Sequence, residues 1–261
     1  MAKRSILGSR AIVTGASSGI GKEIALELCR QGGLVAIAAR REDRLQAVAR
    51  QADGLGGRII AVGGDISLEE ARKRLLDHAL AEFGGLDILV NNAGIGATGL
   101  FASAGPERLR QLMEVNFFAL AEMTRLAIPH LRRGTRPIVV NLSSILGRRG
   151  VPHNSEYCAS KFAVHGFSEA IRTELAGEGI DVLVVSPGTT ETEFFDRVID
   201  RSSEPAWPEH RPVTAAYVAK RTVAAMRAGK REIIPYFWGR LLCAMNRVSP
   251  GLVDRIMRRY V

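Results

Sequence analysis

Six short apolar runs occur along the chain, and each is followed by a segment in which apolar residues return every three or four positions. The runs are residues 10–14, 34–39, 58–63, 86–91, 136–143 and 180–186. They are rich in Val and Ile and almost continuously apolar, which is typical of strands covered on both faces. The helical patterns lie at about 19–31, 42–52, 67–82, 106–130, 155–178 and 214–228. This alternation predicts an α/β fold with a parallel sheet between two layers of helices.

A seventh run, residues 231–235, predicts an edge strand that Pro235 ends. We find no linker and no internal repeat, so we expect one domain over 1–261. The fold is then a Rossmann-type, doubly wound sheet of about seven strands. Two segments fall outside the alternation. Residues 189–213 are polar and contain three prolines, which indicates a surface loop or a lid over the substrate, and 236–261 form a tail after the last strand.

Composition narrows the class of protein. The chain has 261 residues, of which 46% are hydrophobic, enough for one sizeable core. The sequence has no run of about 18 apolar residues, so we expect no membrane-spanning helix. The first apolar stretch is too short for a signal peptide. The three cysteines are far apart and odd in number, which favours a reducing compartment, and we expect a cytoplasmic protein. The five histidines are scattered, so we expect no metal.

The net charge of +9 favours anionic partners. No tight basic tract is interleaved with aromatic residues, so we do not expect nucleic acid to be one of them. A cofactor that carries phosphate, an anionic membrane surface and simple solubility all fit this charge.

The stretch TGASSGIG, residues 14–21, stands between the first predicted strand and the first helix. Gly15, Gly19 and Gly21 allow a tight turn and a close approach of the backbone, and the helix N-terminus offers N–H groups to a phosphate. The spacing differs from the commonest dinucleotide fingerprint. The position between strand and helix nevertheless indicates a phosphate-binding loop.

The end of the second predicted strand carries Arg40 and Arg41 and no acid. An acid at this point binds the ribose 2′-hydroxyl of NAD, whereas an arginine suits the 2′-phosphate of NADP. Guanidinium groups also match phosphate in geometry. Glu42 and Asp43 follow directly, and a solvated start of a helix is the alternative. With the loop upstream, we favour NADP.

Tyr157 and Lys161 stand four residues apart in a helical pattern, with only small side chains between them. Positions i and i+4 lie on one helix face. An ammonium beside a phenol stabilises the phenolate, so we expect the pKa of Tyr157 to fall below its usual value of about 10. Such a pair would suit proton transfer near neutral pH, although a Tyr-x-x-x-Lys pair by itself is more often part of a solvated face.

With these residues in place, the chain resembles the short-chain dehydrogenase/reductase (SDR) family over nearly its full length. Seven motifs occur in the order and at the spacing of the family. They are TGASSGIG (14–21), GDIS (64–67), NNAG (91–94), VN (115–116), NLSS (141–144), YCASK (157–161) and SPG (186–188). The resemblance implies an oxidoreductase that interconverts a carbonyl and an alcohol by hydride transfer, with NADPH as the cofactor. The family also implies a homodimer or a homotetramer.

The resemblance assigns roles to matching positions. The implied catalytic residues are Asn116, Ser144, Tyr157 and Lys161. The implied and inferred cofactor-binding residues are Gly15, Ser17, Ser18, Gly19, Ile20, Gly21, Arg40, Arg41, Asp65, Ile66, Asn92, Ala93, Gly94, Tyr157, Lys161, Pro187, Gly188, Thr190 and Thr192. In this scheme Tyr157 exchanges the proton and Ser144 orients the carbonyl. Asn116 kinks its helix and links Lys161 to solvent through water. Thr190 departs from the family, which usually has Val or Ile there.

The substrate is not named by the sequence. Its wall is expected from 95–101, 145–154 and 189–212, which follow strand ends. Arg148 and Arg149 would meet an anionic substrate or simply be solvated. The lid aromatics Phe194, Phe195 and Trp207 would cover an apolar substrate or pack on each other.

The tail, 236–261, has apolar and aromatic residues at helical spacing, and residues 230–261 hold seven basic and two acidic residues. We favour a pair of short helices docked on the protein or on a neighbouring subunit, with a new helix starting at Ser249-Pro250. The alternative is an amphipathic segment on the inner face of an anionic membrane.

Three functions remain in view: a carbonyl reductase or alcohol dehydrogenase acting on an apolar substrate, a 3-ketoacyl reductase of lipid synthesis, and a non-catalytic NADP sensor on the same fold. Arg148 and Arg149 would suit the phosphate of an acyl carrier. The presence of all four implied catalytic residues argues against a sensor.

Overall fold

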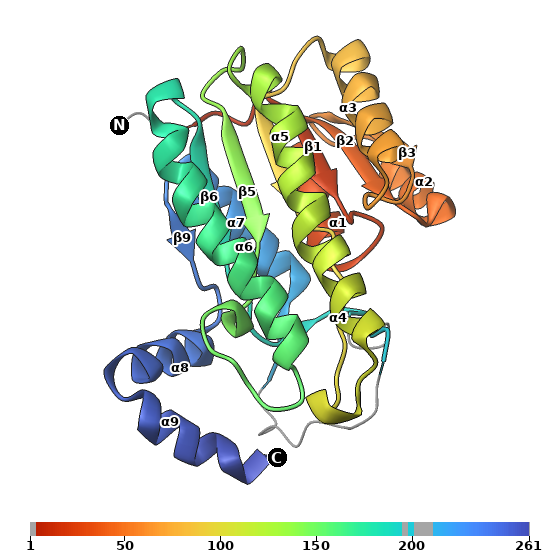
Figure 1. The fold of residues 1–261 in the computed structure, drawn as a ribbon. Coiled ribbons are helices and arrows are strands. Elements are labelled where there is room, and N and C mark those ends of the chain that lie inside the picture. The colour runs from red at the N-terminus through yellow and green to blue at the C-terminus, as the bar shows by residue number, and fades with distance from the viewer. Residues whose placement is uncertain (1–3, 195–197, 201–210, 261) are drawn as a thin grey trace.

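Seven strands form one sheet in the order β3-β2-β1-β4-β5-β6-β9, and every neighbouring pair is parallel (Figure 1). The structure is a computed structural model that describes residues 4–194, 198–200 and 211–260. The strands are β1 (Arg10–Thr14), β2 (Leu34–Ala39), β3 (Arg58–Gly63), β4 (Ile88–Asn91), β5 (Ile138–Leu142), β6 (Asp181–Val185) and β9 (Glu232–Ile233). The predicted doubly wound parallel sheet, including its edge strand, is confirmed.

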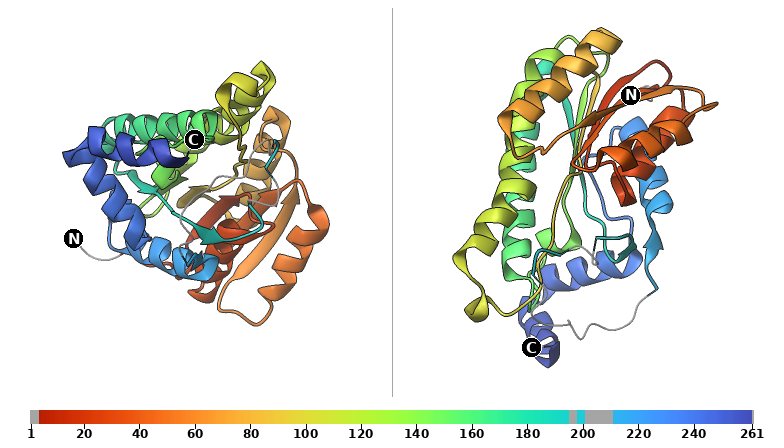
Figure 2. Two further views of the ribbon diagram at one scale, coloured as in Figure 1. Left: turned by 90° about the horizontal axis from the view of Figure 1, so that it is seen from below. Right: turned by 90° about the vertical axis from the view of Figure 1, so that its right-hand side faces the viewer.

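Helices cover both faces of the sheet, as the right-hand view of Figure 2 shows. One layer contains α1 (Gly19–Arg30), α2 (Glu42–Gln51) and α7 (Ala215–Arg227). The other contains α3 (Glu69–Phe83), α5 (Ala119–Leu131) and α6 (Ser155–Glu174). Successive strand residues point to opposite layers: Val13 packs in the core on the α1 side and Ile12 in the core on the α3 side. Both faces of the inner strands β1, β2, β4, β5 and β6 are mostly buried, which explains their almost continuous apolar runs, whereas the edge strands β3 and β9 are partly exposed.

The helix expected over 106–130 is divided into three segments: α4 (Pro106–Met113), a π-helical turn η2 (Glu114–Phe118) and α5. Asn116, in the π turn, is completely buried and bonds the backbone of Ile95. Single π turns occur often at functional sites. The family resemblance implied a kink of this helix at Asn116, and the π turn contains that residue.

Shorter elements lie mainly at the carboxyl ends of the strands. They are η1 (Phe101–Ser103), η3 (Ile145–Gly147), η4 (Ala176–Glu178) and the strand pair β7 (Thr190–Glu191) and β8 (Val213–Thr214). The tail forms α8 (Phe237–Val248), α9 (Pro250–Met257) and a final turn η6 (Arg258–Tyr260), and α9 does begin at the predicted Ser249-Pro250.

The tail folds back under the carboxyl ends of β5 and β6 (Figure 1). Val253 and Met257 of α9 are buried against Val151 and Cys158. The tail therefore forms two short helices, α8 and α9, that pack on the protein. Among the described residues, no helix combines the length and the apolar character needed to cross a membrane.

Candidate active site

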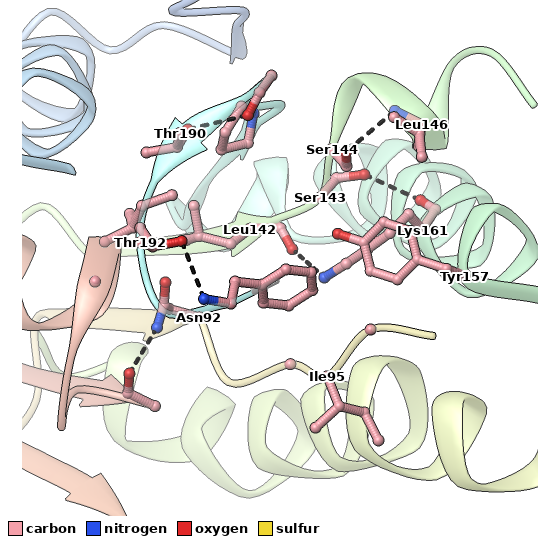
Figure 3. Close-up of a pocket in the computed structure, with 18 of the residues that line it drawn as sticks. Asn92, Ile95, Leu142, Ser143, Ser144, Leu146, Tyr157, Lys161, Thr190 and Thr192 are labelled. Carbon is pink, nitrogen blue, oxygen red and sulfur yellow. Dashed lines mark hydrogen bonds between the residues drawn. The ribbon is translucent and has the colours of Figure 1, made fainter. Parts of the chain in front are cut away.

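A cavity of about 740 Å³ lies at the carboxyl ends of the central strands (Figure 3). It runs from the glycine-rich loop after β1 to the helices of the tail. Parallel strands bring their following loops to one edge, and ligands of open α/β sheets bind there. This cavity is lined by most of the catalytic and cofactor-binding residues that the sequence predicted. Gly21 and Asn116 do not line it, and both lie behind its wall.

Ser144, Tyr157 and Lys161 meet on one side of the cavity (Figure 3). Ser144 follows β5, and its Oγ accepts a hydrogen bond of 3.1 Å from the N–H of Leu146. Lys161 lies one helical turn after Tyr157 on α6, with its Nζ 5.8 Å from the centroid of the tyrosine ring. The same Nζ donates to the Leu142 carbonyl at 3.0 Å. Strand β5 and helix α6 therefore hold the three groups together.

The electrostatics of this group differ from the expectation. Burial raises the pKa of Tyr157 because the phenolate loses its hydration, and the Ser144 hydroxyl opposes this only in part. Burial also lowers the pKa of Lys161 to about 8. The predicted fall in the pKa of Tyr157 is wrong for this arrangement. The Lys161 ammonium donates to the Leu142 carbonyl, and burial has the largest effect on the pKa of Tyr157.

Asn116 supports the site from behind. Its Oδ1 accepts from the Ile95 N–H at 2.8 Å, and its Nδ2 donates to the Ile95 carbonyl and to Ser160 Oγ, both at 3.0 Å. It thereby joins the loop after β4 to helix α6, which carries Tyr157 and Lys161. The water link between Asn116 and Lys161 stays a prediction. Ser143, next to Ser144, donates to the Lys161 carbonyl at 3.0 Å.

The glycine-rich loop is pressed against the end of β4. Gly15 has φ +67°, and a Cβ there would lie 2.7 Å from Cα of Ala93. A Cβ at Gly21 would collide with the side-chain nitrogen of Asn92, which donates to the carbonyls of Thr14 and Gly15 at 3.0 Å each. Gly21 thus allows close packing of the loop, while Gly15 lines the cavity.

The rest of the predicted cofactor set borders the cavity. These residues are Ser17, Ser18, Gly19, Ile20, Arg40, Arg41, Asp65, Ile66, Asn92, Ala93, Gly94, Pro187, Gly188, Thr190 and Thr192. Asp65 Oδ1 accepts from the N–H and the hydroxyl of Ser67 at 3.0 and 2.8 Å. The hydroxyl of Thr190, the residue that departs from the family pattern, donates to the Gly188 carbonyl at 3.0 Å. The threonine is buried there, so its polar group is satisfied within the turn.

Arg41 is turned toward the glycine-rich loop. Its Nη2 donates to Ser17 Oγ and Ser18 Oγ, both at 2.9 Å, and its Nη1 lies 3.2 Å from the carboxylate of Glu193. The alternative in which Glu42 and Asp43 neutralise this arginine is not what the structure shows. Arg44, which the sequence reasoning missed, bonds the same carboxylate at 2.6 and 2.8 Å. Its spacing from Arg41 in the first turn of α2 was the available signal.

The other end of the cavity is apolar. The residues there that sequence reasoning did not place at the site come from the tail: Trp238, Leu241, Leu242, Met245, Ile256 and Met257. Phe194 from the predicted lid also lines it, with its ring centroid 5.7 Å from that of Tyr157. Phe195 and Trp207 lie outside the described residues.

Arg148 and Arg149 do not face an open anion site. Arg148 forms a two-point ion pair with Glu232 of β9. Arg149 donates to Asn246 of α8 at 3.0 Å and to Asp254 of α9 at 2.5 Å. Neither of the two alternatives, contact with an anionic substrate or simple solvation, describes this pair, because both arginines bond the tail or the last strand to the loop after β5.

Comparison with known proteins supports the family resemblance that the sequence motifs indicated. The sequence model of the family described as short chain dehydrogenase matches residues 9–202. The chain is 34% identical over 265 residues to 11-beta-hydroxysteroid dehydrogenase A of Sesamum indicum, covering 97% of this chain and 75% of that protein. It is 31% identical over 261 residues to ketoacyl reductase HetN of a Nostoc species, covering 98% and 90%.

Solved structures share the fold. A short chain dehydrogenase from Burkholderia cenocepacia, solved in complex with NADP, has a TM-score of 0.78 and 32% identity, covering 88% of this chain and 97% of that one. A short chain dehydrogenase/reductase from Burkholderia phymatum, solved in complex with NAD, has a TM-score of 0.86 at 23% identity, covering 95% and 96%.

Proposed function

The chain belongs to the short-chain dehydrogenase family, and on that basis we propose that it is an NADP(H)-dependent oxidoreductase that interconverts a carbonyl and a secondary alcohol on an apolar substrate. The observation that carries the proposal is the meeting of Ser144, Tyr157 and Lys161 at one cavity with the glycine-rich loop and Arg41. A nicotinamide cofactor, when bound, supplies the hydride that the side chains lack.

The residues present fit such a cofactor. Gly15 lets the loop pack directly on Ala93, since a Cβ there would lie 2.7 Å from Cα of Ala93, and the loop borders the cavity. The N-terminus of α1 offers N–H groups to a pyrophosphate. Arg41 lies against the serines of the same loop and suits a 2′-phosphate. Asp65 and Ile66 would border the adenine, and Lys161 the nicotinamide ribose. Thr190 and Thr192 would border the carboxamide and the pyrophosphate.

The proton chemistry follows from the chain's own groups. The Ser144 hydroxyl donates to the substrate oxygen and orients the carbonyl. Tyr157 gives its phenolic proton to that oxygen as the carbonyl becomes an alcohol, and takes it back in the reverse reaction. Burial raises the pKa of Tyr157, which keeps the proton in place over a wide pH range. Tyr157 is therefore in the protonated state that reduction of a carbonyl requires.

The apolar wall supports an apolar substrate. Trp238, Leu242, Met245 and Met257 border the cavity beyond Tyr157, and burying apolar surface there favours a ligand of the same character. The 3-ketoacyl reductase of lipid synthesis remains the second candidate, since the chain is similar to ketoacyl reductase HetN. The phosphate contact first expected for it at Arg148 and Arg149 does not support it.

We extend the proposal to assembly and location. Phe118 in the π turn and Phe162 on α6 are both exposed, 48% and 45%, and a homodimer or homotetramer would cover them. Three free cysteines fit a cytoplasmic protein. Phe237 and Trp238 of the tail are also exposed beside Arg240, and this surface would allow weak contact with an anionic membrane.

The test is NADPH oxidation across ketones graded by size and polarity, from small polar compounds to long-chain and steroid-like ones. We expect turnover to rise with apolar size. Tyr157→Phe keeps the ring and removes the proton, so it should bind NADPH normally and lose about 10²-fold or more in turnover. Near-normal rates for this variant, or failure of the wild type on every ketone, would overturn the proposal.

A further inference from the structure

A carboxylate of the chain itself is paired both with Arg41, which bonds the glycine-rich loop, and with Arg44. Glu193, in the segment after β7, is bonded by Arg44 Nη1 through both oxygens, at 2.6 and 2.8 Å. Arg41 Nη1 approaches the same group at 3.2 Å. Arg41 and Arg44 thus form an anion-binding cluster, and in this structure the carboxylate of Glu193 occupies it.

The position of this cluster is where the proposed function places the cofactor's 2′-phosphate. Arg41 follows β2 and is the N-cap residue of α2. Its Nη2 donates to the hydroxyls of Ser17 and Ser18 in the phosphate-binding loop. Glu193 therefore holds a guanidinium that a 2′-phosphate would need. A phosphate monoester carries a charge of about −1.5 to −2 at pH 7, more than one carboxylate, so it can displace Glu193. A ribose hydroxyl, as in NAD, cannot.

We propose that Glu193 is a specificity-determining residue that competes with the 2′-phosphate of NADP(H) for Arg41 and Arg44, and that Arg44 is a second cation of the phosphate site. The inference rests on the proposed cofactor. Both ion pairs are partly exposed, and exposed pairs contribute little each, so the effect should be about threefold to tenfold in affinity rather than orders of magnitude.

The competition also reaches the catalytic tyrosine. Residues 192–194 lie across the site: a Cβ on Gly19 would be 3.1 Å from Cγ2 of Thr192, and the ring of Phe194 packs on Tyr157 with centroids 5.7 Å apart. When a 2′-phosphate displaces Glu193, the segment loses its fastening at the cofactor end. Phosphate binding should then loosen Phe194 from Tyr157, while a nucleotide without the phosphate should not.

The experiment measures binding of 2′,5′-ADP and of 5′-AMP to the full chain by calorimetry. Glu193→Gln should tighten 2′,5′-ADP about threefold to tenfold and leave 5′-AMP unchanged. Glu191→Gln is the matched control, because it removes the same charge from an exposed neighbour two residues away and should change neither nucleotide. Arg44→Met should weaken 2′,5′-ADP alone. Added salt should reduce each difference.

Hydrogen exchange of residues 189–194 gives a second measurement. In the wild type, 2′,5′-ADP should speed exchange in this segment relative to 5′-AMP, and in Glu193→Gln the two nucleotides should give equal exchange. Unchanged or weaker 2′,5′-ADP binding by Glu193→Gln, or a loss for Arg44→Met that is equal for both nucleotides, would overturn the inference. A wild type that binds 5′-AMP and 2′,5′-ADP equally would instead overturn the proposed cofactor.

Discussion

Replacing Lys161 with methionine is expected to stabilise the folded protein near pH 7 while abolishing turnover. Lys161 is only 4% exposed, and burial lowers its pKa from 10.5 to about 8. Near pH 7 the folded protein must therefore hold a charged amine that the unfolded chain exposes to water. The shift corresponds to a cost of about 3 kcal/mol. Methionine has a similar length and removes the charge.

The sign follows from proton linkage. The pKa of Lys161 is lower in the folded than in the unfolded state, so the unfolded state binds the proton more tightly. The cost is full below pH 8, falls as the pH rises from about 8 to 10.5, and is gone above that. Methionine also loses the hydrogen bond to the Leu142 carbonyl, about 1 kcal/mol at any pH. The variant should be about 2 kcal/mol more stable at pH 7 and about 1 kcal/mol less stable above pH 10.5.

The assay is urea denaturation of both proteins at several pH values between 6 and 11, with unfolding monitored by circular dichroism. At pH 7 the gain corresponds to a Tm increase of about 5 °C for a chain of this size. Lys220→Met on α7 is the control, because that lysine is exposed and its loss should give a difference that does not vary with pH. The reasoning would be refuted if the difference in the free energy of unfolding between wild type and Lys161→Met stayed constant from pH 7 to 11. It would also be refuted if the variant were less stable than the wild type at pH 7.

Three further outcomes are expected. Arg40→Asp combined with Arg41→Ala should weaken NADPH much more than NADH, and a wild type with equal affinity for both cofactors would count against the choice of NADP. Deleting 236–261 should lower the Tm, since Val253 and Met257 each lose burial worth about 1.5–3 kcal/mol; an unchanged Tm together with loss of salt-sensitive binding to anionic vesicles would favour a membrane role for the tail. Light scattering should give a dimer or tetramer mass, and a monomer mass at working concentration would contradict the predicted assembly.

The sheet was predictable because its strands are buried on both faces and read as apolar runs. The first three strands match their predicted ranges, and the later ones are shorter by a residue or more at their ends. The apolar spacing of 106–130 did not indicate the π turn, since one extra residue in a turn leaves that spacing almost unchanged. Only the family resemblance implied a kink at Asn116. Asn116, within that turn, bonds the backbone of Ile95, a contact that the helical pattern does not reveal.

At the site, residue identities were more predictable than their partners. Motif spacing placed Ser144, Tyr157 and Lys161, and all three border the cavity. The pairing of Arg44 with Glu193 joins positions 149 residues apart in the sequence, so no local pattern could indicate it. The pKa of Tyr157 was predicted in the wrong direction, because a helical i, i+4 relation gives the lysine's proximity but says nothing of the burial that the surrounding fold imposes.

The sequence neighbours of Tyr157 connect this residue to the predicted lid and to the tail. Glu156 pairs with the buried Arg108, which also bonds Asp200 of the predicted lid at 2.7 Å. On the other side, Cys158 packs against Val253 of the tail. Removing one partner of a buried ion pair leaves an uncompensated charge, which is strongly destabilising. Changes in the lid or the tail therefore act on the position of the phenol as well as on the substrate wall, and they should alter kcat together with KM.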